Sequence, residues 1–383
     1  MGEALAIRSN EAGRAVGKHE PPVQRLRVLQ VILVLGQTNS QYNQHCLPLR
    51  EVYHISICTY FKPKLDHPAE IQVFAGDDTL RGFFRALDGA LAASEYDVIH
   101  AHAPHTSTLL TLALLVRPRR WRLRRKLVYT VRDSFHDYKL RNKLLMLPAL
   151  AFWPRVVFCG HAAQDSYPSL WKRLIGRRAR VVQNAADLDR VDRAVAGAVR
   201  DRNGGTFEVL SVGRLESVKD PLTLLAALRR VDGERVRLKF VGAGSMQVQL
   251  AGEARSAGLE NRVELTGLIP RDDVFVRFAS TDLFVSASRG EGLPVAVIEA
   301  MATGCPVVLS DIPPHRELAE GVDFVPFVAL GDAEGFAREI DRFRDMSPAE
   351  RRAIGQKCQD LARSRFSLPV MHAAYEKVYG ELR

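Results

Sequence analysis

The chain has 383 residues, of which 46% are hydrophobic and 26% charged, and this ordinary globular balance excludes a wholly disordered protein. The length exceeds what one hydrophobic core usually serves, so two domains are expected. The formal net charge of +10 suits nucleic acid, a membrane surface or a phosphorylated ligand, but aromatic-interleaved RNA-binding motifs are absent, so no nucleic-acid partner is expected.

The N-terminal residues 1–24 are polar and contain no apolar signal core, so we expect a mobile tail on a cytoplasmic protein. No apolar run has the length of a membrane span. The cysteines are scattered and odd in number, without the spacing of a metal site, which favours reduced thiols. They are Cys46, Cys58, Cys159, Cys305 and Cys358.

Short apolar runs alternate with helical patterns along the chain, which is typical of βα units and parallel sheets. The expected strands of the first half are 27–35, 53–59, 71–74, 97–100, 126–131, 155–159 and 180–183, with a helix over 79–93. After a polar, glycine-rich stretch the expected strands are 207–212, 237–241, 263–265, 283–286 and 306–309. Helices are expected between them at 221–231, 245–257, 271–279 and 294–303, and after them at 333–343, 348–365 and 369–382.

This alternation predicts an α/β fold of two Rossmann-like parallel-sheet domains that face each other. We expect an N-terminal domain over 25–195 and a C-terminal domain over 200–365. Ligands of open parallel sheets bind beyond the carboxyl ends of the strands. The chemistry is therefore expected on loops that line an interdomain cleft.

The first candidate loop is Gly213-Arg214-Leu-Glu-Ser-Val-Lys219-Asp220-Pro221, which joins an expected strand to an expected helix. Asp is a preferred N-cap and Pro a preferred first helical residue. Arg214 and Lys219 would then lie at the mouth of the sheet, where two cations suit a diphosphate. The alternative is a solvated pair of surface charges.

The second candidate loop is Arg289-Gly-Glu291-Gly-Leu-Pro294, followed by a helix that carries Glu299. Free N–H groups at a helix start attract an anion, and Glu291 would lie beside it. Glu299 has apolar neighbours, where an unpaired carboxylate is costly, so a ligand-facing role is favoured over a salt bridge.

Two further patterns are weaker. Val241-Gly242-Ala-Gly-Ser follows a strand, but Gln247 stands where a dinucleotide-binding fingerprint needs glycine. A turn that admits a ligand and a plain strand-to-helix turn both remain open. His100 and His102 share one face of a strand without further metal ligands, which favours satisfied core histidines.

Several of these runs together resemble retaining glycosyltransferases of family 4, which have the GT-B fold. The matching runs are G-R-L-x4-K-D, V-G-x-G-S, T-G-L-I-P and E-G-L-P-x4-E-A-M-A-x-G-x-P-V-V, in this order over residues 207–317. Fainter matches are D-V-I-H-A-H at 97–102, V-Y-T-V at 128–131 and Q-N-A-A-D at 183–187.

The resemblance implies a role for each matched position. Arg214 and Lys219 would neutralise the diphosphate leaving group, and Glu291 would contact the donor sugar together with the backbone of Gly292 and Leu293. Glu299 would hold the ribose.

The same resemblance places Gly213, Gly242, Gly267 and Leu268 around the donor, with the last two near the base. It also implies that residues 366–383 pack back on the N-terminal domain, and that no metal or other cofactor is needed beyond the nucleoside-diphosphate sugar.

One position departs from the family pattern. The family often has a histidine after the strand at 127–131, and Arg132 stands there, followed by Asp133, Ser134 and His136. An arginine stays charged and cannot act as a base. His136 or Asp133 would then supply the missing group, Arg132 would bind a charged substrate, or activity would be impaired.

The sequence therefore predicts a metal-independent retaining glycosyltransferase. The alternatives are a sugar-nucleotide-binding protein without activity and a sugar-nucleotide epimerase. The acceptor stays open, with a lipid-linked or membrane-proximal glycan as one option. The basic run Arg117–Lys126, with Trp121 and Leu123, is expected to contact anionic lipid at the inner face of the membrane.

Overall fold

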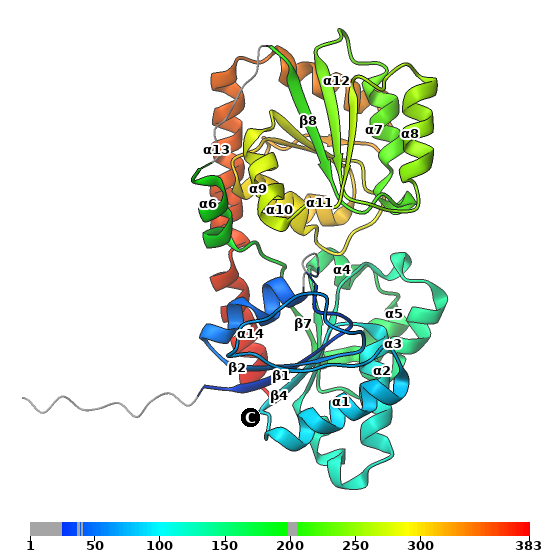
Figure 1. Cartoon of the computed structure of the whole chain (residues 1–383), viewed down its shortest axis with the longest axis vertical. Helices are drawn as coiled ribbons and strands as arrows, with labels where there is room; N and C mark the ends of the chain where they lie inside the picture. Colours follow the sequence, from blue (N-terminus) through cyan, green and yellow to red (C-terminus); the bar gives the residue numbers. More distant parts are fainter. Residues whose placement is uncertain (1–24, 37–38, 40, 198–204) are drawn as a thin grey trace, which may run out of the picture.

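The computed structural model describes residues 25–36, 39, 41–197 and 205–383, and the tail expected over 1–24 lies outside these ranges. Each half of the chain forms one parallel sheet with helices on its faces, and the two sheets lie one above the other in Figure 1. The predicted α/β class is therefore confirmed.

The N-terminal sheet has seven strands in the order β3-β2-β1-β4-β5-β6-β7. They are β1 (Arg27–Ile32), β2 (His54–Thr59), β3 (Gln72–Phe74), β4 (Val98–Ala101), β5 (Leu127–Val131), β6 (Arg155–Phe158) and β7 (Ala179–Val181). All their pairings are parallel. β1 and β2 are buried at five of their six positions, because helices cover both faces of the sheet.

The C-terminal sheet has six strands in the order β10-β9-β8-β11-β12-β13. They are β8 (Phe207–Val212), β9 (Val236–Val241), β10 (Val263–Gly267), β11 (Leu283–Ser286), β12 (Val307–Ser310) and β13 (Phe327–Val328). The sequence reading missed β13, which pairs with β12 through only two residues. Strands this short carry too little pattern to be found from the sequence.

The helices of the N-terminal half are α1 (Leu80–Ala93), α2 (Pro104–Leu115), α3 (Leu140–Phe152), α4 (His161–Asp165), α5 (Ser169–Ile175) and α6 (Leu188–Val195). The sequence reading found only α1. In α2 the hydroxyls of Ser107 and Thr111 donate to the helix's own carbonyls at 2.9 and 2.8 Å. This local bonding lets small polar residues lie in a buried helix that shows no apolar stripe.

The helices of the C-terminal half are α7 (Pro221–Leu228), α8 (Gln247–Ser256), α9 (Arg271–Ser280), α10 (Val295–Ala302), α11 (Pro313–Leu318), α12 (Ala333–Asp345), α13 (Pro348–Arg365) and α14 (Leu368–Gly380). Asp220 is the N-cap residue of α7 and Pro221 its first residue, as expected, but the Asp220 side chain does not cap the helix. Asp220 precedes the helix in the left-handed conformation (φ 46°), and its carboxylate bonds to Thr223 Oγ1 and Arg289 instead of the helix N–H groups.

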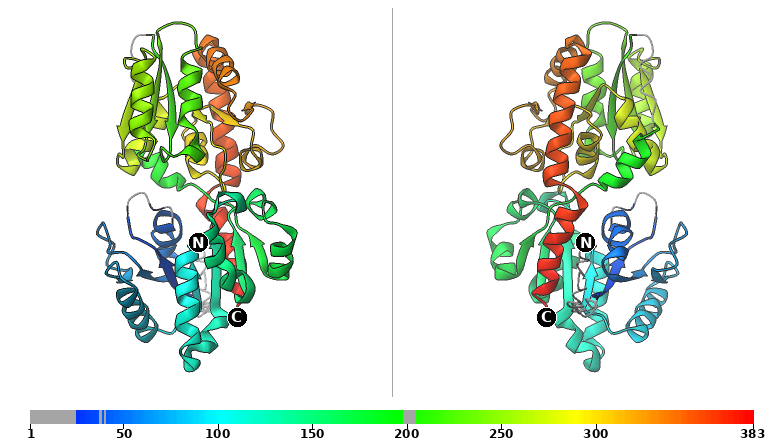
Figure 2. Two further views of the ribbon diagram at one scale, coloured as in Figure 1. Left: turned by 90° about the vertical axis from the view of Figure 1, so that its right-hand side faces the viewer. Right: turned by 90° about the vertical axis from the view of Figure 1, so that its left-hand side faces the viewer.

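The last two helices link the domains. α13 packs against α10 in the C-terminal domain, and the chain then crosses to the N-terminal domain, as Figure 2 shows along one side of the molecule. α14 buries Tyr375 and Tyr379 in the core that contains β1. The final helix thus lies on the first domain.

The basic run forms a short 3-10 helix, η3 (Pro118–Lys126), beside the end of α2. Trp121 and Leu123 pack against the core of the N-terminal domain and are only partly exposed, so little of either side chain is available for the expected contact with lipid. Arg117 and Arg120 pair with Asp88 of α1. Arg119, Arg122 and Arg125 remain exposed.

Candidate functional site

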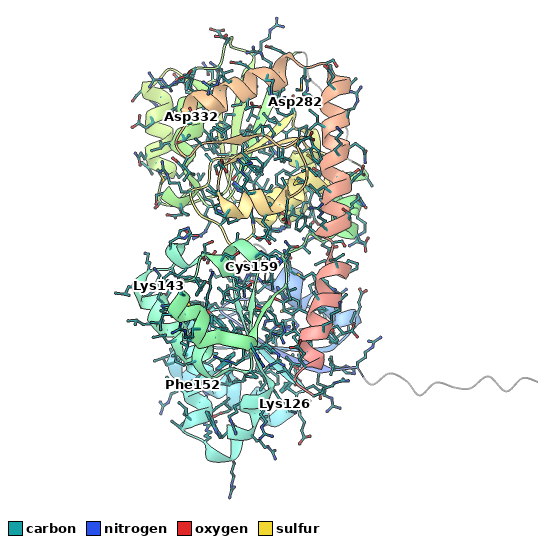
Figure 3. The ribbon with its side chains drawn as sticks, turned by 180° about the vertical axis from the view of Figure 1, so that it is seen from behind. Lys126, Lys143, Phe152, Cys159, Asp282 and Asp332 are labelled. Carbon is teal, nitrogen blue, oxygen red and sulfur yellow. The ribbon has the colours of Figure 1, made fainter. Side chains whose placement is uncertain are left out.

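The loops that follow the parallel strands of both sheets meet between the two domains. Figure 3 shows Cys159, which directly follows β6, at the level where the domains face each other. The loop at 132–138 follows β5, and the loop at 287–294 follows β11. The predicted cleft residues are therefore brought to one place from both domains.

The two domains touch at the loop around Glu291. Ser134 Oγ donates to the carbonyl of Glu291 at 2.6 Å, and Asn184 Nδ2 donates to the carbonyl of Leu293 at 2.7 Å. A Cβ atom at position 292 would overlap the carbonyl oxygen of Arg132, so only glycine permits this approach. Leu293 itself is buried in the core.

A second contact joins the domains through Glu317 of α11. Its carboxylate accepts hydrogen bonds from the backbone N–H groups of His161 and Ala162 at 2.8 and 2.7 Å, and from Gln183 Nε2 at 2.6 Å. The sequence reading did not single out Glu317, because its partners lie more than 130 residues away.

The loop after β8 carries the predicted cations. Gly213 lies against the turn at Gly242, where a Cβ atom would overlap the carbonyl oxygen of Gly213. The glycine of the Val241-Gly242 run therefore serves a close approach between two protein loops. Arg214 is exposed, and Lys219 lies in a short helical turn with its ammonium paired to Glu291.

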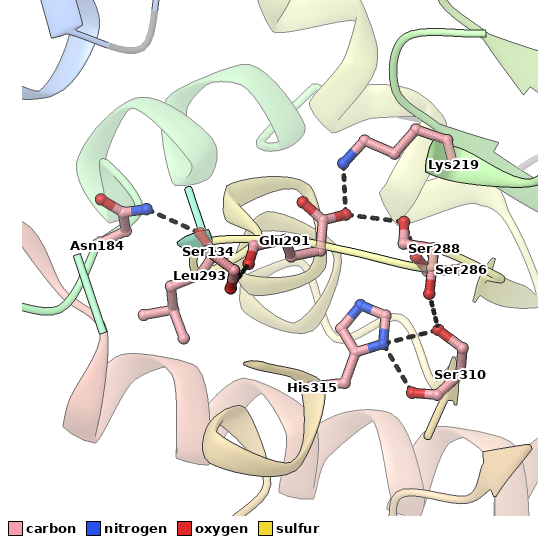
Figure 4. Close-up of polar contacts among 9 residues, drawn as sticks. All are labelled: Ser134, Asn184, Lys219, Ser286, Ser288, Glu291, Leu293, Ser310 and His315. Carbon is pink, nitrogen blue, oxygen red and sulfur yellow. Dashed lines mark hydrogen bonds and ion pairs between the residues drawn. The ribbon is translucent and has the colours of Figure 1, made fainter. Parts of the chain in front are cut away.

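Glu291 is held by two side chains from its own domain. Ser288 Oγ donates to Glu291 Oε1 at 2.8 Å, and Lys219 forms an ion pair with the same oxygen. Burial raises the pKa of Glu291, but the positive charge of Lys219 and the hydrogen bonds from Lys219 and Ser288 outweigh burial, so the net pKa lies below its ordinary value. The carboxylate is therefore ionised near pH 7, and Figure 4 shows its contacts with Lys219 and Ser288.

Glu299 is buried in α10, and the premise that it lacks a protein partner is wrong. Its carboxylate forms an ion pair with Arg271 at the start of α9. Burial raises the pKa of Glu299, and Arg271 only partly offsets this effect. A ribose role would require a ligand to share or displace this pairing.

The turn after β10 places the other two predicted donor residues. The carbonyl of Gly267 accepts a hydrogen bond from the Gly242 N–H at 2.9 Å. The next side chain, Leu268, is 69% exposed at the sheet edge. An exposed leucine at that position offers an apolar surface to a flat ring.

The loop after β5 differs from expectation at Arg132. The Arg132 guanidinium contacts His45 Nε2 at 3.0 Å and Gln44 Oε1 at 3.4 Å, both in a helical turn after β1, η1 (Tyr42–Cys46). His136 projects outward, with its side chain 65% exposed and its Nε2 3.7 Å from Asp137 Oδ1. The histidine expected to replace the family's base is thus turned toward solvent.

Two carboxylates of this loop face the Glu291 loop. Burial of the Asp133 carboxyl among the surrounding protein atoms raises its pKa first, and the nearby charge of Glu291 adds to the rise. Asp137, which the sequence reading did not name, packs against Gly290. Its Oδ2 is buried and has no hydrogen-bond partner among the residues that the structure describes.

Three buried histidines stack behind the cleft in the N-terminal domain. The rings of His100 and His102 lie 4.0 Å apart, and those of His45 and His102 lie 4.7 Å apart. His100 bonds to the hydroxyl of Tyr379 at 2.8 Å, and His102 bonds to Gln30 at 2.7 Å. These histidines tie α14 to the sheet.

The C-terminal half of the chain matches a known protein family. Residues 196–359 match the family described as glycosyl transferases group 1. A lipopolysaccharide core biosynthesis glycosyltransferase of Rhizobium meliloti, LpsE, is 35% identical over 45% of this chain and 48% of its own length. The chain thus aligns with about half the length of that relative.

Two longer matches cover both domains. An Escherichia coli UDP-Gal:alpha-D-GlcNAc-diphosphoundecaprenol alpha-1,3-galactosyltransferase is 24% identical over 78% of each chain. The crystal structure of Anabaena Alr3699/HepE with UDP and glucose superposes with a TM-score of 0.72 at 19% identity, over 93% of this chain and 100% of that one. The likeness in fold confirms the GT-B architecture.

The motifs of residues 207–317 lie inside the matched region, which supports the predicted similarity to group 1 glycosyltransferases, whereas family 4 stays a prediction. Residues 196–359 are thus similar to the glycosyl transferases of group 1.

Proposed function

We propose that the chain transfers a sugar from a nucleoside-diphosphate sugar to an acceptor hydroxyl, with retention of configuration and without a bound metal. The observation that carries the proposal is the Glu291 carboxylate, held by Lys219 and Ser288 at the point where the two domains meet. In this proposal residues 200–365 bind the donor and residues 25–195 bind the acceptor.

The chemistry makes and breaks one bond at the anomeric carbon. The bond to the diphosphate oxygen breaks, a bond to the acceptor oxygen forms on the same face, and the acceptor proton passes to the leaving diphosphate. Arg214 and Lys219 supply positive charge where negative charge develops on that diphosphate. In this proposal the backbone N–H groups of Gly292 and Leu293, just before α10, would also contact the donor.

The donor would be held at both of its ends. Glu291 lies beside the transferred sugar, and Glu299 with Arg271 lies where the ribose would bind. Leu268 offers its exposed side chain to the base. UDP is the first nucleotide to test, because the HepE structure holds UDP and the E. coli relative is named for UDP-Gal.

Thermal shift with a panel of nucleoside diphosphates tests donor binding, since a ligand that binds the native state raises its stability by mass action. Mass spectrometry then follows consumption of the matching sugar nucleotide, with Glu291→Gln as the inactive comparison. Binding without turnover would favour the inactive binding protein, and an altered sugar on intact nucleotide would favour the epimerase.

The acceptor side also offers a surface for a membrane, and we propose a lipid-linked acceptor on this basis. α2 and α3 follow adjacent parallel strands, so both end at the edge of the sheet remote from the cleft, beside η3. Figure 3 shows Phe152 and Lys126 toward this end of the molecule. Exposed apolar side chains there are Leu112, Leu115, Val116 and Phe152.

Basic side chains accompany this apolar surface. Arg119, Arg122 and Arg125 of η3 are exposed next to it. Charge attraction to an anionic bilayer is worth about 1 kcal/mol per basic residue. Among the described residues no helix is both long and apolar enough to cross a membrane.

A further inference from the structure

A chain of buried polar groups lies behind Glu291 and ends at His315 of α11 (Figure 4). Ser288 Oγ donates to Glu291 Oε1 at 2.8 Å, and Ser310 Oγ donates to the carbonyl of Ser288 at 2.5 Å. His315 Nδ1 lies 2.8 Å from the carbonyl oxygen of Ser310 and 3.1 Å from its hydroxyl. The ends of β11 and β12 and the start of α11 are thus connected to the carboxylate.

These contacts fix the protonation of the His315 ring. A carbonyl oxygen only accepts hydrogen bonds, so Nδ1 carries the proton. Burial lowers the pKa of His315 to about 4, although the charge of Glu291 opposes this, so the ring is neutral near pH 7 and Nε2 is unprotonated. Nε2 is buried and lacks a hydrogen-bond partner among the described residues.

The unpartnered nitrogen makes a purely structural role expensive. An unsatisfied buried acceptor costs roughly 1–3 kcal/mol, which an apolar ring such as phenylalanine would avoid. In Figure 4 this nitrogen is on the side of the ring that faces Glu291. Compared with an apolar ring, the histidine therefore adds the Nδ1–H hydrogen bond to Ser310 and an uncharged Nε2 behind the carboxylate.

Building on the proposed transferase function, we propose that His315 is a positioning residue for Glu291. Its Nδ1–H fixes Ser310 at the end of β12, Ser310 fixes the backbone of Ser288, and the Ser288 hydroxyl fixes the carboxylate beside the donor sugar. Because the His315 ring is neutral, it does not compete for the negative charge of Glu291. That charge interacts with Lys219 and, during the reaction, with the positive charge that develops at the anomeric carbon.

Two substitutions separate this role from packing. His315→Phe keeps the ring volume and removes the Nδ1–H donor, whereas His315→Asn places an amide N–H near the position of Nδ1. With UDP-glucose and UDP-galactose as probes, His315→Phe is expected to lower kcat about 10- to 100-fold with the Kd for UDP unchanged. His315→Asn should recover most of kcat.

Ser310→Ala, which cuts the link to Ser288, should resemble His315→Phe. His54→Phe, at an exposed position of β2, is the matched control and should leave kcat unchanged. An unchanged kcat in His315→Phe would overturn the proposal. So would an Asn variant as slow as the Phe variant while both melt at the same temperature.

A second measurement does not depend on turnover. ¹⁵N NMR of the imidazole is expected to show the Nδ1–H tautomer for His315, with the Nε2 signal shifting in Glu291→Gln and not in the exposed control Glu264→Gln. A different tautomer of His315, or an Nε2 signal that does not shift in Glu291→Gln, would overturn the proposal whatever the activity. If the NMR result holds but no sugar nucleotide is consumed, the transferase proposal fails and the positioning of Glu291 stands.

Discussion

The two sides of the cleft are built in different ways. On the C-terminal side, the loops at 213–221 and 287–294 pair their own charges, Lys219 with Glu291 and Asp220 with Arg289. On the N-terminal side, the loop at 132–138 presents Asp133 and Asp137. Asp137 Oδ1 lies 3.7 Å from the exposed His136, and Asp137 Oδ2 lacks a hydrogen-bond partner in the described part of the chain.

This difference follows from what each side is proposed to bind. Polar groups that are already held in place before the ligand binds need little reorganisation free energy during the reaction. The ion pairs on the C-terminal side are expected for a donor site of this kind. A buried polar atom without a protein partner is costly, which is expected where a substrate completes the bonding. The comparison thus predicts that substitutions on the two sides change different kinetic constants.

The largest effects are expected on the C-terminal side. Arg214→Ala and Lys219→Ala should each lower kcat/KM by the equivalent of roughly 2.7–4 kcal/mol. Each removes a positive charge that is proposed to stabilise the leaving diphosphate. Single-turnover kinetics with the identified donor measure the loss. Arg237→Ala, exposed at the opposite edge of the C-terminal sheet, is the matched control.

Lys219→Ala also leaves Glu291 without its ion pair, so the loss has to be separated from unfolding. The double variant Lys219→Ala with Glu291→Gln removes the unpaired charge and should recover stability without recovering activity. Wild-type turnover in both Arg214→Ala and Lys219→Ala would show that the diphosphate does not bind there.

The contrast between the two sides also explains what the sequence could reveal. Glu291, Lys219 and Arg214 were predictable because each lies in a short run in which glycine or proline marks the end of a strand and the start of a helix. The family's motifs cover these same runs. The candidate residues of the C-terminal side therefore lie in short local motifs.

The remaining features depend on contacts between distant parts of the chain. Arg132 lies 87 residues from His45, and Glu317 lies 156 residues from His161. Glu299 appeared unpaired in the sequence because its partner Arg271 lies in another helix. No local pattern records such pairs, so the arrangement of the N-terminal side and the domain contacts could be found only from the fold.

The next effect concerns the loop at 132–138. Asp133→Asn should reduce kcat about 10-fold, because it removes the carboxylate that faces Glu291 across the cleft. Arg132→Ala should mainly raise KM, since its guanidinium is anchored by Gln44 and His45. His136→Ala should change kcat less than about twofold, because that side chain is largely exposed.

Steady-state kinetics of these three variants test whether the loop takes part in chemistry or only in binding. A His136→Ala variant that loses most of its kcat would reverse the assignment between His136 and Asp133. If Arg132→His creates activity that the native protein lacks, the native protein is the inactive binding protein.

A smaller effect is expected on stability against acid. The pKa of Glu291 in the folded protein lies below its ordinary value of 4.5, so the ionised carboxylate stabilises the fold above that pH. This contribution is lost as the pH falls through the folded-state pKa. Its size is set by how far the folded-state pKa lies below the ordinary value, at about 1.4 kcal/mol per pKa unit.

Urea denaturation of wild type and Glu291→Gln between pH 7 and pH 3 measures this contribution. The difference in the free energy of unfolding should shrink as the pH falls below about 4.5. A difference that stays constant over this range would mean that Lys219 and Ser288 do not hold the carboxylate as an anion.

The smallest single effect is expected at the surface remote from the cleft. Arg122→Ser should weaken binding to vesicles that contain anionic lipid by about 1 kcal/mol, or roughly fivefold in the partition coefficient. Sedimentation with vesicles of increasing anionic lipid content measures it. Arg338→Ser in α12 changes the net charge equally but lies in the other domain, so it should bind as wild type does.

Because Trp121 and Leu123 pack inward, the apolar contribution falls to Val116 and its neighbours, and Val116→Ser should weaken binding at every lipid composition. Binding that does not depend on anionic lipid would remove the role of η3, and equal losses in Arg122→Ser and Arg338→Ser would reduce it to net charge alone.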